Sequence, residues 1–399
     1  MSKESKPLAG VKVLELGTLI AGPFCTRILA EFGAEVIKVE SPDGGDPLRQ
    51  WRKLHQGTSL WWSVQARNKK SLTANLKHPE GLAAVRQLAA EADIVVENFR
   101  PGVLEKLGLG WDVLSAANPG LVMVRLSGFG QTGPYKDRPG FGAIGESMGG
   151  LRYITGFPDR PPVRTGISIG DSIAALWAAI GALMALRHRE VNGGAGQVVD
   201  VALYEAVFAM MESMVPEFDV AGFMRERTGN IMPGITPSNT HTTRDGRHVI
   251  IGGNGDAIFN RLMRAIGRPD LAEAPDLVSN AGRDLRAAEI YTVIDAWVAA
   301  RDGDAVLAAM EVAEVPASSV FSVADMFRDA QFAARGMLEE ASLPDGQPLR
   351  IPGVVPKLSA TPGATEWLGP KLGEHTDEIL AGLGYSPEKI AALRADGAI

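Results

Sequence analysis

Apolar strands that alternate with amphipathic helices are the feature that most constrains this chain. Residues 11–16 alternate apolar and polar side chains as a strand does, and residues 25–32 have helical spacing. Gly33 breaks this helix, and residues 36–40 again have the pattern of a strand. Two strands joined through a helix lie parallel in one sheet, so the chain opens with a βαβ unit.

The same rhythm recurs as far as residue 214. We expect a helix over 79–92, a strand over 93–99, short helices near Gly102 and Trp111, a strand over 121–127, a long helix from Asp171 to about 189, a strand over 197–201 and a helix over 203–214. This order predicts an α/β fold with a parallel sheet that helices cover on both faces.

The second part of the chain has a different pattern. Glycine and proline recur between 216 and 240, as in a linker. A turn at Asp245-Gly246 joins two expected strands at 240–243 and 248–252, and helices follow at about 256–266, 284–300 and 304–312. These elements predict a smaller α+β unit. The chain then becomes extended and ends in two short helices after His375 and Ser386.

Net charge, cysteine content and the length of the apolar segments limit the partners and the compartment that we expect. The formal charge of -7 argues against nucleic acid. The single cysteine, Cys25, fits a reducing cytoplasm, and its apolar neighbours predict a core residue. The first six residues lack the apolar segment of a secretory signal. The longest apolar run, 173–186, is shorter than the ~20 residues of a membrane span, so we expect a buried core helix and no membrane.

Several common motifs are incomplete or absent from the sequence. Residues 128–133 match the Gly-x-Gly-x-x-Gly fingerprint, but Pro134 follows where a nucleotide-binding helix must begin. The six histidines lack metal-ligand spacing, and neither a Gly-x-Ser-x-Gly elbow nor a Gly-Lys-Ser/Thr phosphate loop occurs. The sequence therefore predicts no metal and no permanently bound nicotinamide or flavin.

Three features have both a structural and a chemical interpretation. Asp171 precedes the apolar helix, where an aspartate caps the N-terminus or, kept ionised there, acts as a nucleophile. The glycines of 252–255 form either a turn or a set of backbone N–H donors for an oxyanion. The basic cluster 67–70, together with Lys77 and Lys106, is either solvated surface or a phosphate site.

Seven short motifs are spread over nearly the whole chain, at 8–16, 21–23, 33–40, 67–71, 96–102, 128–134 and 372–376. Together they resemble the class III CoA-transferase family, which includes formyl-CoA transferase. Each is weak alone, and their order along the chain carries the resemblance. Asp171, between Gly170 and Ser172, stands at the position of the family's nucleophile.

The resemblance implies the domain organisation and the assembly. A Rossmann-like large domain that binds CoA is expected from residues 1–220 and 340–399. A smaller α+β domain with its linkers is expected over residues 221–339. Two subunits are expected to thread through each other as interlocked rings, which gives a homodimer.

The resemblance also implies a mechanism in which CoA thioesters are substrates. Asp171 attacks the acyl-CoA carbonyl to form a mixed anhydride, the CoA thiolate returns to form an aspartyl-CoA thioester, and the acceptor acid completes the transfer. Gly252 and Gly253 are expected to provide backbone donors to the oxyanions. The residues expected to contact CoA are Ile20, Ala21, Ala74, Asn75, Lys77, Asn98, Phe99, Arg100, Lys106 and Phe141, with Lys77, Arg100 and Lys106 at its phosphates.

The substrates are a hypothesis. Phe141, Gly142 and Ile20 differ from formyl-CoA transferase, so formyl-CoA and oxalate are not expected. We expect a small dicarboxylate to accept CoA from a donor such as succinyl-CoA. Arg164 and Arg225 are candidates to bind the second carboxylate.

Two alternatives belong to other functional classes. An α-methylacyl-CoA racemase is disfavoured because Phe141 stands where racemases carry a histidine. A CoA-binding protein without catalysis is disfavoured by the intact Gly170-Asp171 segment.

Overall fold

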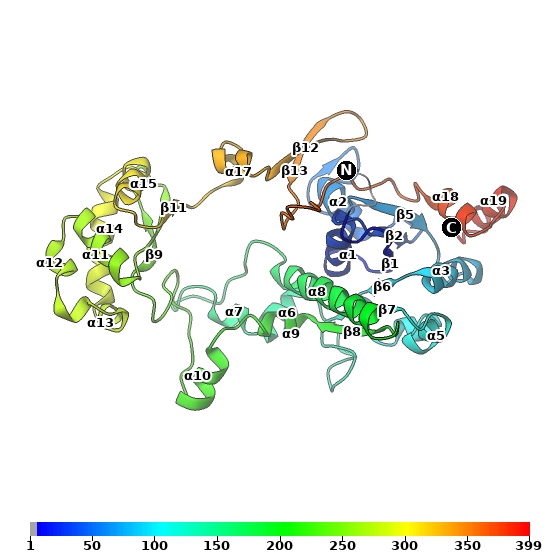
Figure 1. Ribbon diagram of the computed structural model, residues 1–399, viewed down its shortest axis with the longest axis horizontal. Coiled ribbons are helices and arrows are strands. Elements are labelled where there is room, and N and C mark those ends of the chain that lie inside the picture. The colour runs from blue at the N-terminus through cyan, green and yellow to red at the C-terminus, as the bar shows by residue number, and fades with distance from the viewer. Residues whose placement is uncertain (1–5) are drawn as a thin grey trace. The chain divides into compact units, whose positions relative to one another are not determined.

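The computed structural model describes residues 6–399, which form two compact units (Figure 1). The larger unit contains the chain up to Arg152, Thr165–Phe223 and Ala334–Ile399, so both ends of the chain contribute to it. The smaller unit contains Tyr153–Arg164 and Met224–Ala333. The smaller domain expected from the sequence, residues 221–339, does not include Tyr153–Arg164.

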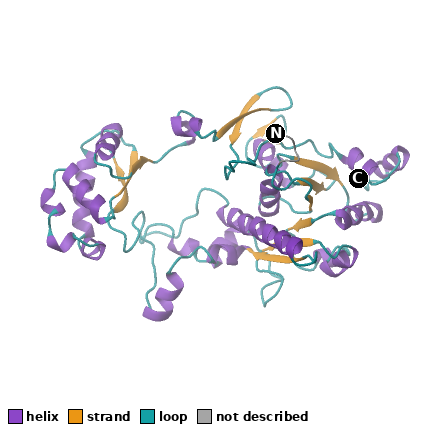
Figure 2. Ribbon diagram, viewed as in Figure 1, coloured by secondary structure: helices purple, strands orange, loops and turns teal. Residues whose placement is uncertain are grey.

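A six-stranded parallel sheet forms the centre of the larger unit (Figure 2). The strands are β1 (Lys12–Glu15), β2 (Glu35–Glu40), β5 (Lys69–Thr73), β6 (Ile94–Glu97), β7 (Val122–Ser127) and β8 (Gln197–Ala202). Their spatial order is β5-β2-β1-β6-β7-β8, and each neighbouring pair is parallel. This is the Rossmann order, in which the connections change direction between β1 and β6. The predicted α/β fold is therefore confirmed.

Helices cover both faces of this sheet because successive side chains of each strand enter opposite cores. Leu14 and Val95 pack into one core, whereas Val13 and Val96 pack into the other. The first core includes residues of α3 (Pro79–Glu91), α5 (Trp111–Ala117), α18 (Thr376–Gly382) and α19 (Pro387–Ala395), and the second includes residues of α1 (Ala21–Glu31), α8 (Ile169–Val191) and α9 (Leu203–Phe208). Cys25 lies in the second core, as predicted.

Shorter elements complete the larger unit. They are η2 (Pro47–Gln50), β3 (Leu54–His55), β4 (Thr58–Ser59), α2 (Leu60–Gln65), α4 (Val103–Lys106), α6 (Gly142–Met148), α7 (Leu151–Ile154) at the unit boundary, α10 (Met214–Ala221), β12 (Leu338–Ser342) and β13 (Pro348–Pro352). The helix predicted over 203–214 is wrong in its second half, because α9 ends at Phe208. Glu212 has a φ of +47°, which an α-helix does not accommodate, and α10 starts after it.

The smaller unit is an α+β structure, as predicted. An antiparallel sheet in the order β11-β10-β9 packs with helices around an apolar core. Its elements are β9 (Ser238–Thr242), β10 (His248–Gly252), α11 (Asp256–Ala265), α12 (Pro269–Ala272), η3 (Pro275–Leu277), α13 (Asn280–Leu285), α14 (Ala287–Ala299), α15 (Gly303–Val312), β11 (Ala317–Ser319), α16 (Val323–Met326) and α17 (Ala330–Ala334).

Helix α8 is longer than the sequence predicts and has two apolar faces. It spans 23 residues, because polar residues at both ends extend the apolar run 173–186, and by length and composition it could cross a membrane, a test that core helices of soluble proteins also pass. Alanines such as Ala174, Ala178 and Ala182 bury one face. The opposite face is exposed and consists of Leu176, Trp177, Ile180, Leu183 and Met184. The core-helix prediction therefore holds for one face only.

Candidate active site

Most residues expected to contact CoA follow the carboxyl ends of parallel strands. Ile20 and Ala21 follow β1, Ala74 to Lys77 follow β5, and Asn98 to Arg100 follow β6. Because the strands are parallel, these segments meet at one edge of the sheet. This edge includes the switch point between β1 and β6, where open α/β sheets bind ligands.

A cavity of about 220 Å³ opens at this edge. Four of the expected CoA residues line it together: Ala74, Asn75, Lys77 and Phe99. The rest of its lining consists of Leu16, Thr18, Lys38, Val39, Glu40, Ser41, Gly45, Asp46 and Leu76. Ile20, Ala21 and Asn98 lie beside it in the adjoining loops, while Arg100 and Lys106 are exposed and do not line it.

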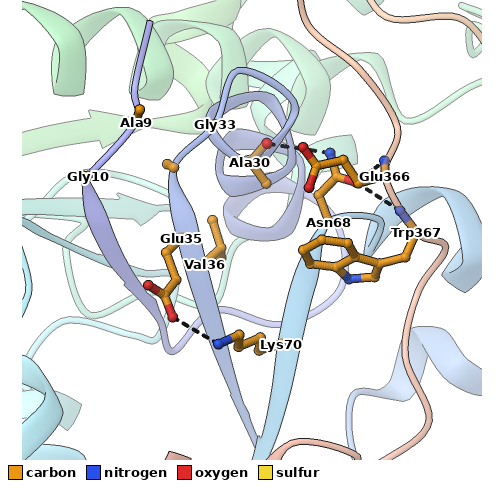
Figure 3. A pocket seen from close by; sticks show the side chains of 11 residues that line it. Ala9, Gly10, Ala30, Gly33, Glu35, Val36, Asn68, Lys70, Glu366 and Trp367 are labelled. Atoms are coloured by element: carbon orange, nitrogen blue, oxygen red, sulfur yellow. Dashed lines mark hydrogen bonds and ion pairs between the residues drawn. The ribbon is translucent and has the colours of Figure 1, made fainter. Parts of the chain in front are cut away.

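A second cavity of about 180 Å³ lies where β2 begins, at the other edge of the sheet (Figure 3). Glu35 and Lys70 face each other there, with 3.1 Å between Oε1 and Nζ. Asn68 Oδ1 accepts a hydrogen bond from the Glu366 N–H at 2.7 Å. Since ligands of parallel sheets bind at the carboxyl ends of the strands, the first cavity is the better candidate for CoA.

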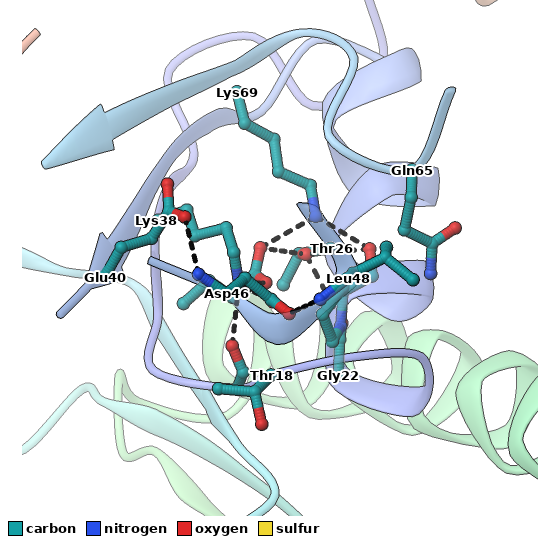
Figure 4. Close-up of polar contacts among 12 residues, drawn as sticks. Thr18, Gly22, Thr26, Lys38, Glu40, Asp46, Leu48, Gln65 and Lys69 are labelled. Atoms are coloured by element: carbon teal, nitrogen blue, oxygen red, sulfur yellow. Dashed lines mark hydrogen bonds and ion pairs between the residues drawn. The ribbon is translucent and has the colours of Figure 1, made fainter. Parts of the chain in front are cut away.

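The loop 17–20 after β1 is held by side chains from four other segments (Figure 4). Asn98 bonds both main-chain groups of Thr18, each at 2.8 Å. Lys38 Nζ donates to the Gly17 carbonyl at 2.7 Å, and Gln65 Nε2 donates to the Ile20 carbonyl at 3.1 Å. Leu19 has a left-handed φ of +65°, and its N–H donates to both carboxylate oxygens of Asp46 at 3.1 Å. Main-chain groups of all four loop residues are thus fixed by side chains.

Two of these side-chain contacts come from a buried cluster of four charges, Glu15, Lys38, Asp46 and Lys69, here called the Glu15 cluster. Lys38 Nζ lies 2.8 Å from both Glu15 Oε1 and Asp46 Oδ2. Lys69 Nζ lies 2.8 Å from Glu15 Oε2 and donates to the Pro23 carbonyl at 2.7 Å. All four side chains are almost fully inaccessible to solvent.

Burial and ion pairing oppose each other in the pKa values of the Glu15 cluster. Burial alone favours a raised pKa for Glu15, but the ammonium groups of Lys38 and Lys69 outweigh it and lower that pKa to about 2. Burial lowers the pKa of Lys69 to about 8, because Glu15 compensates only partly and Lys38 opposes its charge. Lys38 has two carboxylate partners, and its pKa is raised despite burial.

Arg67 and Lys69 of the basic cluster 67–70 fit neither interpretation of that cluster, as solvated surface or as a phosphate site. Arg67, Asn68 and Lys69 are buried, so they are not solvated surface. Arg67 Nε bonds Glu31 Oε1 at 2.6 Å, and Lys69 bonds Glu15, so neither cation is directed at a phosphate. The sequence pattern hides this because the compensating carboxylates lie on other elements.

Asp171 lies in the first turn of α8. The helix begins at Ile169 after an N-cap at Ser168, so Asp171 is the third helical residue and the N-cap interpretation is wrong. A carboxylate in this turn still interacts favourably with the positive end of the helix dipole. Its neighbour across the site is Gly142, since a Cβ at position 142 would overlap the Asp171 carboxylate.

Glu146, on the same helix as Gly142, is a part of this site that the sequence did not reveal. Its Cγ would lie 3.1 Å from a Cβ at Gly170, so it packs behind the Asp171 segment. Its carboxylate is almost completely buried and accepts a hydrogen bond from Arg152 Nε at 3.1 Å. Its Oε1 has no hydrogen-bond partner among residues 6–399. Phe141 precedes Gly142 and is 65% exposed.

Comparison with known proteins identifies the family to which the chain belongs. The model of CoA-transferase family III matches residues 8–376. The chain belongs to CoA-transferase family III. The resemblance found in the motifs is thereby confirmed, and the protein is an enzyme of this family.

Relatives of this family III enzyme match it over nearly their whole length. The succinyl-CoA–D-citramalate CoA-transferase of Chloroflexus aurantiacus is 52% identical over 98% of this chain and 97% of its own. The succinate–glutarate CoA-transferase of Agrobacterium fabrum is 36% identical over 96% of this chain and 97% of its own. A crystal structure of a CAIB/BAIF family protein from Brucella suis has a TM-score of 0.82 at 36% identity and covers 95% of this chain and 100% of that one.

The glycine loop of this family III enzyme belongs to the smaller unit. The N–H groups of Gly252 and Gly253 donate to the carbonyls of Pro316 and Pro237, at 2.9 and 2.8 Å. These two donors are therefore already used within the unit. The N–H groups of Asn254 and Gly255, which follow them, make no main-chain hydrogen bond among the described residues.

Other chemistry-bearing groups of the family III enzyme lie outside this site. Burial raises the pKa of the Cys25 thiol to about 12, so it is not a nucleophile. Among residues 6–399, no three His, Cys, Asp or Glu side chains are grouped to hold a metal ion. After the Gly128–Gly133 motif, the next helix begins only at Gly142.

Proposed function

We propose that this enzyme transfers CoA from succinyl-CoA to a small dicarboxylic acid, with Asp171 as its covalent nucleophile. The relatives named for citramalate and glutarate support this substrate class. The observation that carries the role of Asp171 is its place in the first turn of α8, partly accessible and against a glycine whose missing side chain leaves room for its carboxylate.

The reaction then follows from carboxylate chemistry. Asp171 attacks the thioester carbon, the C–S bond breaks, and a mixed anhydride and CoA thiolate form. The thiolate attacks the Asp171 Cγ and releases the donor acid, which leaves an aspartyl-CoA thioester. The acceptor carboxylate then attacks Cγ and expels the thiolate, which takes the acceptor's acyl group and regenerates Asp171.

Each attack creates an oxyanion that needs hydrogen-bond donors. We assign these donors to the glycine loop of 252–255. Because the N–H groups of Gly252 and Gly253 already donate to carbonyls, the assignment moves from these two residues to the N–H groups of Asn254 and Gly255.

CoA itself is assigned to the cavity at the carboxyl ends of the strands. Ala74, Asn75 and Phe99 contribute its walls, and Ile20, Ala21, Asn98 and Phe141 adjoin the thioester end. Lys77, Arg100 and Lys106 contact phosphates, for which their exposed side chains are suited. CoA enters as a substrate, and no permanently bound cofactor is needed.

We also propose that the enzyme is an interlocked homodimer. The chain leaves the larger unit, forms the smaller unit and returns to the larger unit. A subunit with this chain path can form a ring through which a second subunit passes. The exposed face of α8, which includes Trp177 and Met184, is more apolar than the face of a solvated helix usually is. We propose that a second copy of the chain covers this face. The cytoplasm is the expected compartment, with no nucleic-acid or membrane partner.

The test is product analysis with a mixture of acids. The enzyme is given succinyl-CoA with mono- and dicarboxylic acids, beside Asp171→Ala, and new acyl-CoA species are identified by mass. We expect CoA thioesters of dicarboxylic acids with the wild type and none with Asp171→Ala. Deuterium exchange alpha to a branched acyl-CoA, without transfer, would instead indicate a racemase. Arg164→Met and Arg225→Met are included because a selective loss of dicarboxylate transfer would assign the second carboxylate to either residue.

A further inference from the structure

We propose that the Glu15 cluster is a positioning device that holds the loop 17–20 in the conformation that binds the CoA moiety. The inference rests on the proposed function, since it concerns the CoA cavity assigned above. Asp46, Lys38 and Lys69 are positioning residues in this account, because they act on the ligand through the loop.

The loop needs such support because its conformation is not one that the chain adopts readily. Leu19 has a φ of +65°, a left-handed conformation that disfavours residues with a Cβ. The Asp46 carboxylate accepts the N–H of Leu19 with both oxygens and the N–H of Leu48 at 2.9 Å. Asp46 therefore joins the strained residue to the 3₁₀ helix η2.

The cluster transmits this support from the centre of the sheet. Lys38 on β2 bonds Asp46, the Gly17 carbonyl and Glu15 at once. Lys69 on β5 bonds Glu15 and the Pro23 carbonyl near the start of α1. The two lysines thus fix main-chain groups on both sides of Ile20 and Ala21, which are expected to contact CoA.

Stability alone does not account for four buried charges. Buried ion pairs are often no better than apolar residues of similar size, because desolvation offsets their attraction. A charged cluster does provide directional bonds to carbonyl and N–H groups that apolar side chains cannot make. Here the bonds of Lys38 and Asp46 end on the loop, and that of Lys69 ends on the Pro23 carbonyl just after it. Lys38 and Asp46 also line the cavity.

The larger unit contains a natural control for this argument. Arg67 and Glu31 are also buried and bonded, at 2.6 Å between Nε and Oε1. Arg67 also donates to the Pro352 carbonyl at 2.7 Å, so this pair ties α1 to the end of β13. No hydrogen bond links either side chain to the loop 17–20 among the described residues.

The experiment compares CoA affinity in four variants by calorimetric titration of the full-length enzyme with CoA. Asp46→Ala and Lys69→Met are expected to raise the CoA Kd at least tenfold. Asp46→Asn keeps an acceptor for the Leu19 N–H and is expected to recover much of the affinity lost in Asp46→Ala. Arg67→Met is expected to lower the Tm by a similar amount while leaving the Kd within about twofold of wild type.

The outcomes separate the positioning role from a general structural role. If Arg67→Met weakens CoA binding as much as Lys69→Met at equal loss of Tm, or if Asp46→Asn and Asp46→Ala are equally defective, the proposal is overturned. A Kd unchanged in both folded Asp46 variants also overturns it. Failure of the wild-type enzyme to bind CoA contradicts the proposed function itself and is recognised before any variant is compared.

Discussion

Gly142 lies so close to the carboxylate of Asp171 that no side chain fits between them. Gly142 is fully buried on α6, and Asp171 is partly accessible on α8. Two short stretches of the larger unit, separated in sequence by the segment Tyr153–Arg164, therefore meet at the proposed nucleophile. The relationship makes position 142 a sensitive probe of the site.

Gly142→Ala is expected to lower kcat at least tenfold, which corresponds to about 1.4 kcal/mol of activation free energy. The added Cβ displaces the Asp171 carboxylate from its position. Gly166→Ala is the matched control, because its Cβ would meet no atom within 4 Å. Initial rates of CoA transfer measure both variants, and equal rates for Gly142→Ala and wild type would contradict the close contact.

The Glu146–Arg152 pair predicts an asymmetry in stability. Arg152→Met leaves a buried carboxylate uncompensated and is expected to cost about 3 kcal/mol in the free energy of unfolding. Glu146→Gln leaves only a partly exposed arginine without its carboxylate and is expected to cost about 1 kcal/mol. The double variant is expected to be more stable than Arg152→Met alone in chemical denaturation. If the double variant is less stable than either single variant, the uncompensated charge of Glu146 does not explain the loss of stability in Arg152→Met.

Lys69 predicts a dependence of stability on alkaline pH. Its pKa is lowered from 10.5 to about 8 in the folded protein, so the unfolded chain binds more protons between these values. The free energy of unfolding of the wild type is therefore expected to rise relative to Lys69→Met as pH increases from 8 to 10.5. The titratable groups that face Lys69 are Glu15, Lys38, Asp46 and Cys25. The pKa of Cys25, about 12, lies above the range from pH 8 to 10.5. If the difference in the free energy of unfolding between the wild type and Lys69→Met does not change with pH, Lys69 does not titrate in this range.

The exposed face of α8 predicts the assembly. Met184→Glu places a charge at a side chain that is 66% exposed in the single chain and is expected to weaken dimerisation at least tenfold. Leu285→Glu, at a 90% exposed position of the smaller unit, is the control and is expected to leave the assembly intact. Sedimentation equilibrium measures both, and a monomeric wild type would contradict the proposed dimer.

The fold could be predicted where apolar spacing is regular. The strands β1, β2, β6 and β7, the helices α1, α3 and α8, and the β9–β10 hairpin lie at or near the expected residues. Local pattern suffices there, because each element buries its own apolar face.

Strand β5 was hidden because it begins with two lysines. Lys69 is fully buried, yet its partner Glu15 is 54 positions away in the sequence. No local pattern reveals such a pair. Helix α6, with Gly142 and Glu146, was missed for a related reason: it is short and glycine-rich, and its packing against the start of α8 defines it.

The candidate site was predictable only in part. Asp171 and the segments after β5 and β6 came from motif resemblance, and the Rossmann order explains why those segments meet. The supporting residues Asp46 and Lys38 gave no signal, because their roles depend on a loop conformation that only the three-dimensional structure displays.

The central claim is tested most directly by the mass of the protein during turnover. The enzyme is mixed with succinyl-CoA without acceptor, quenched in acid, digested and analysed for the peptide that contains Asp171. A CoA thioester on Asp171, lost on adding acceptor acid and absent from Asp171→Ala, is the predicted result. Efficient transfer without any adduct, or transfer that persists in Asp171→Ala, would contradict a covalent role for Asp171.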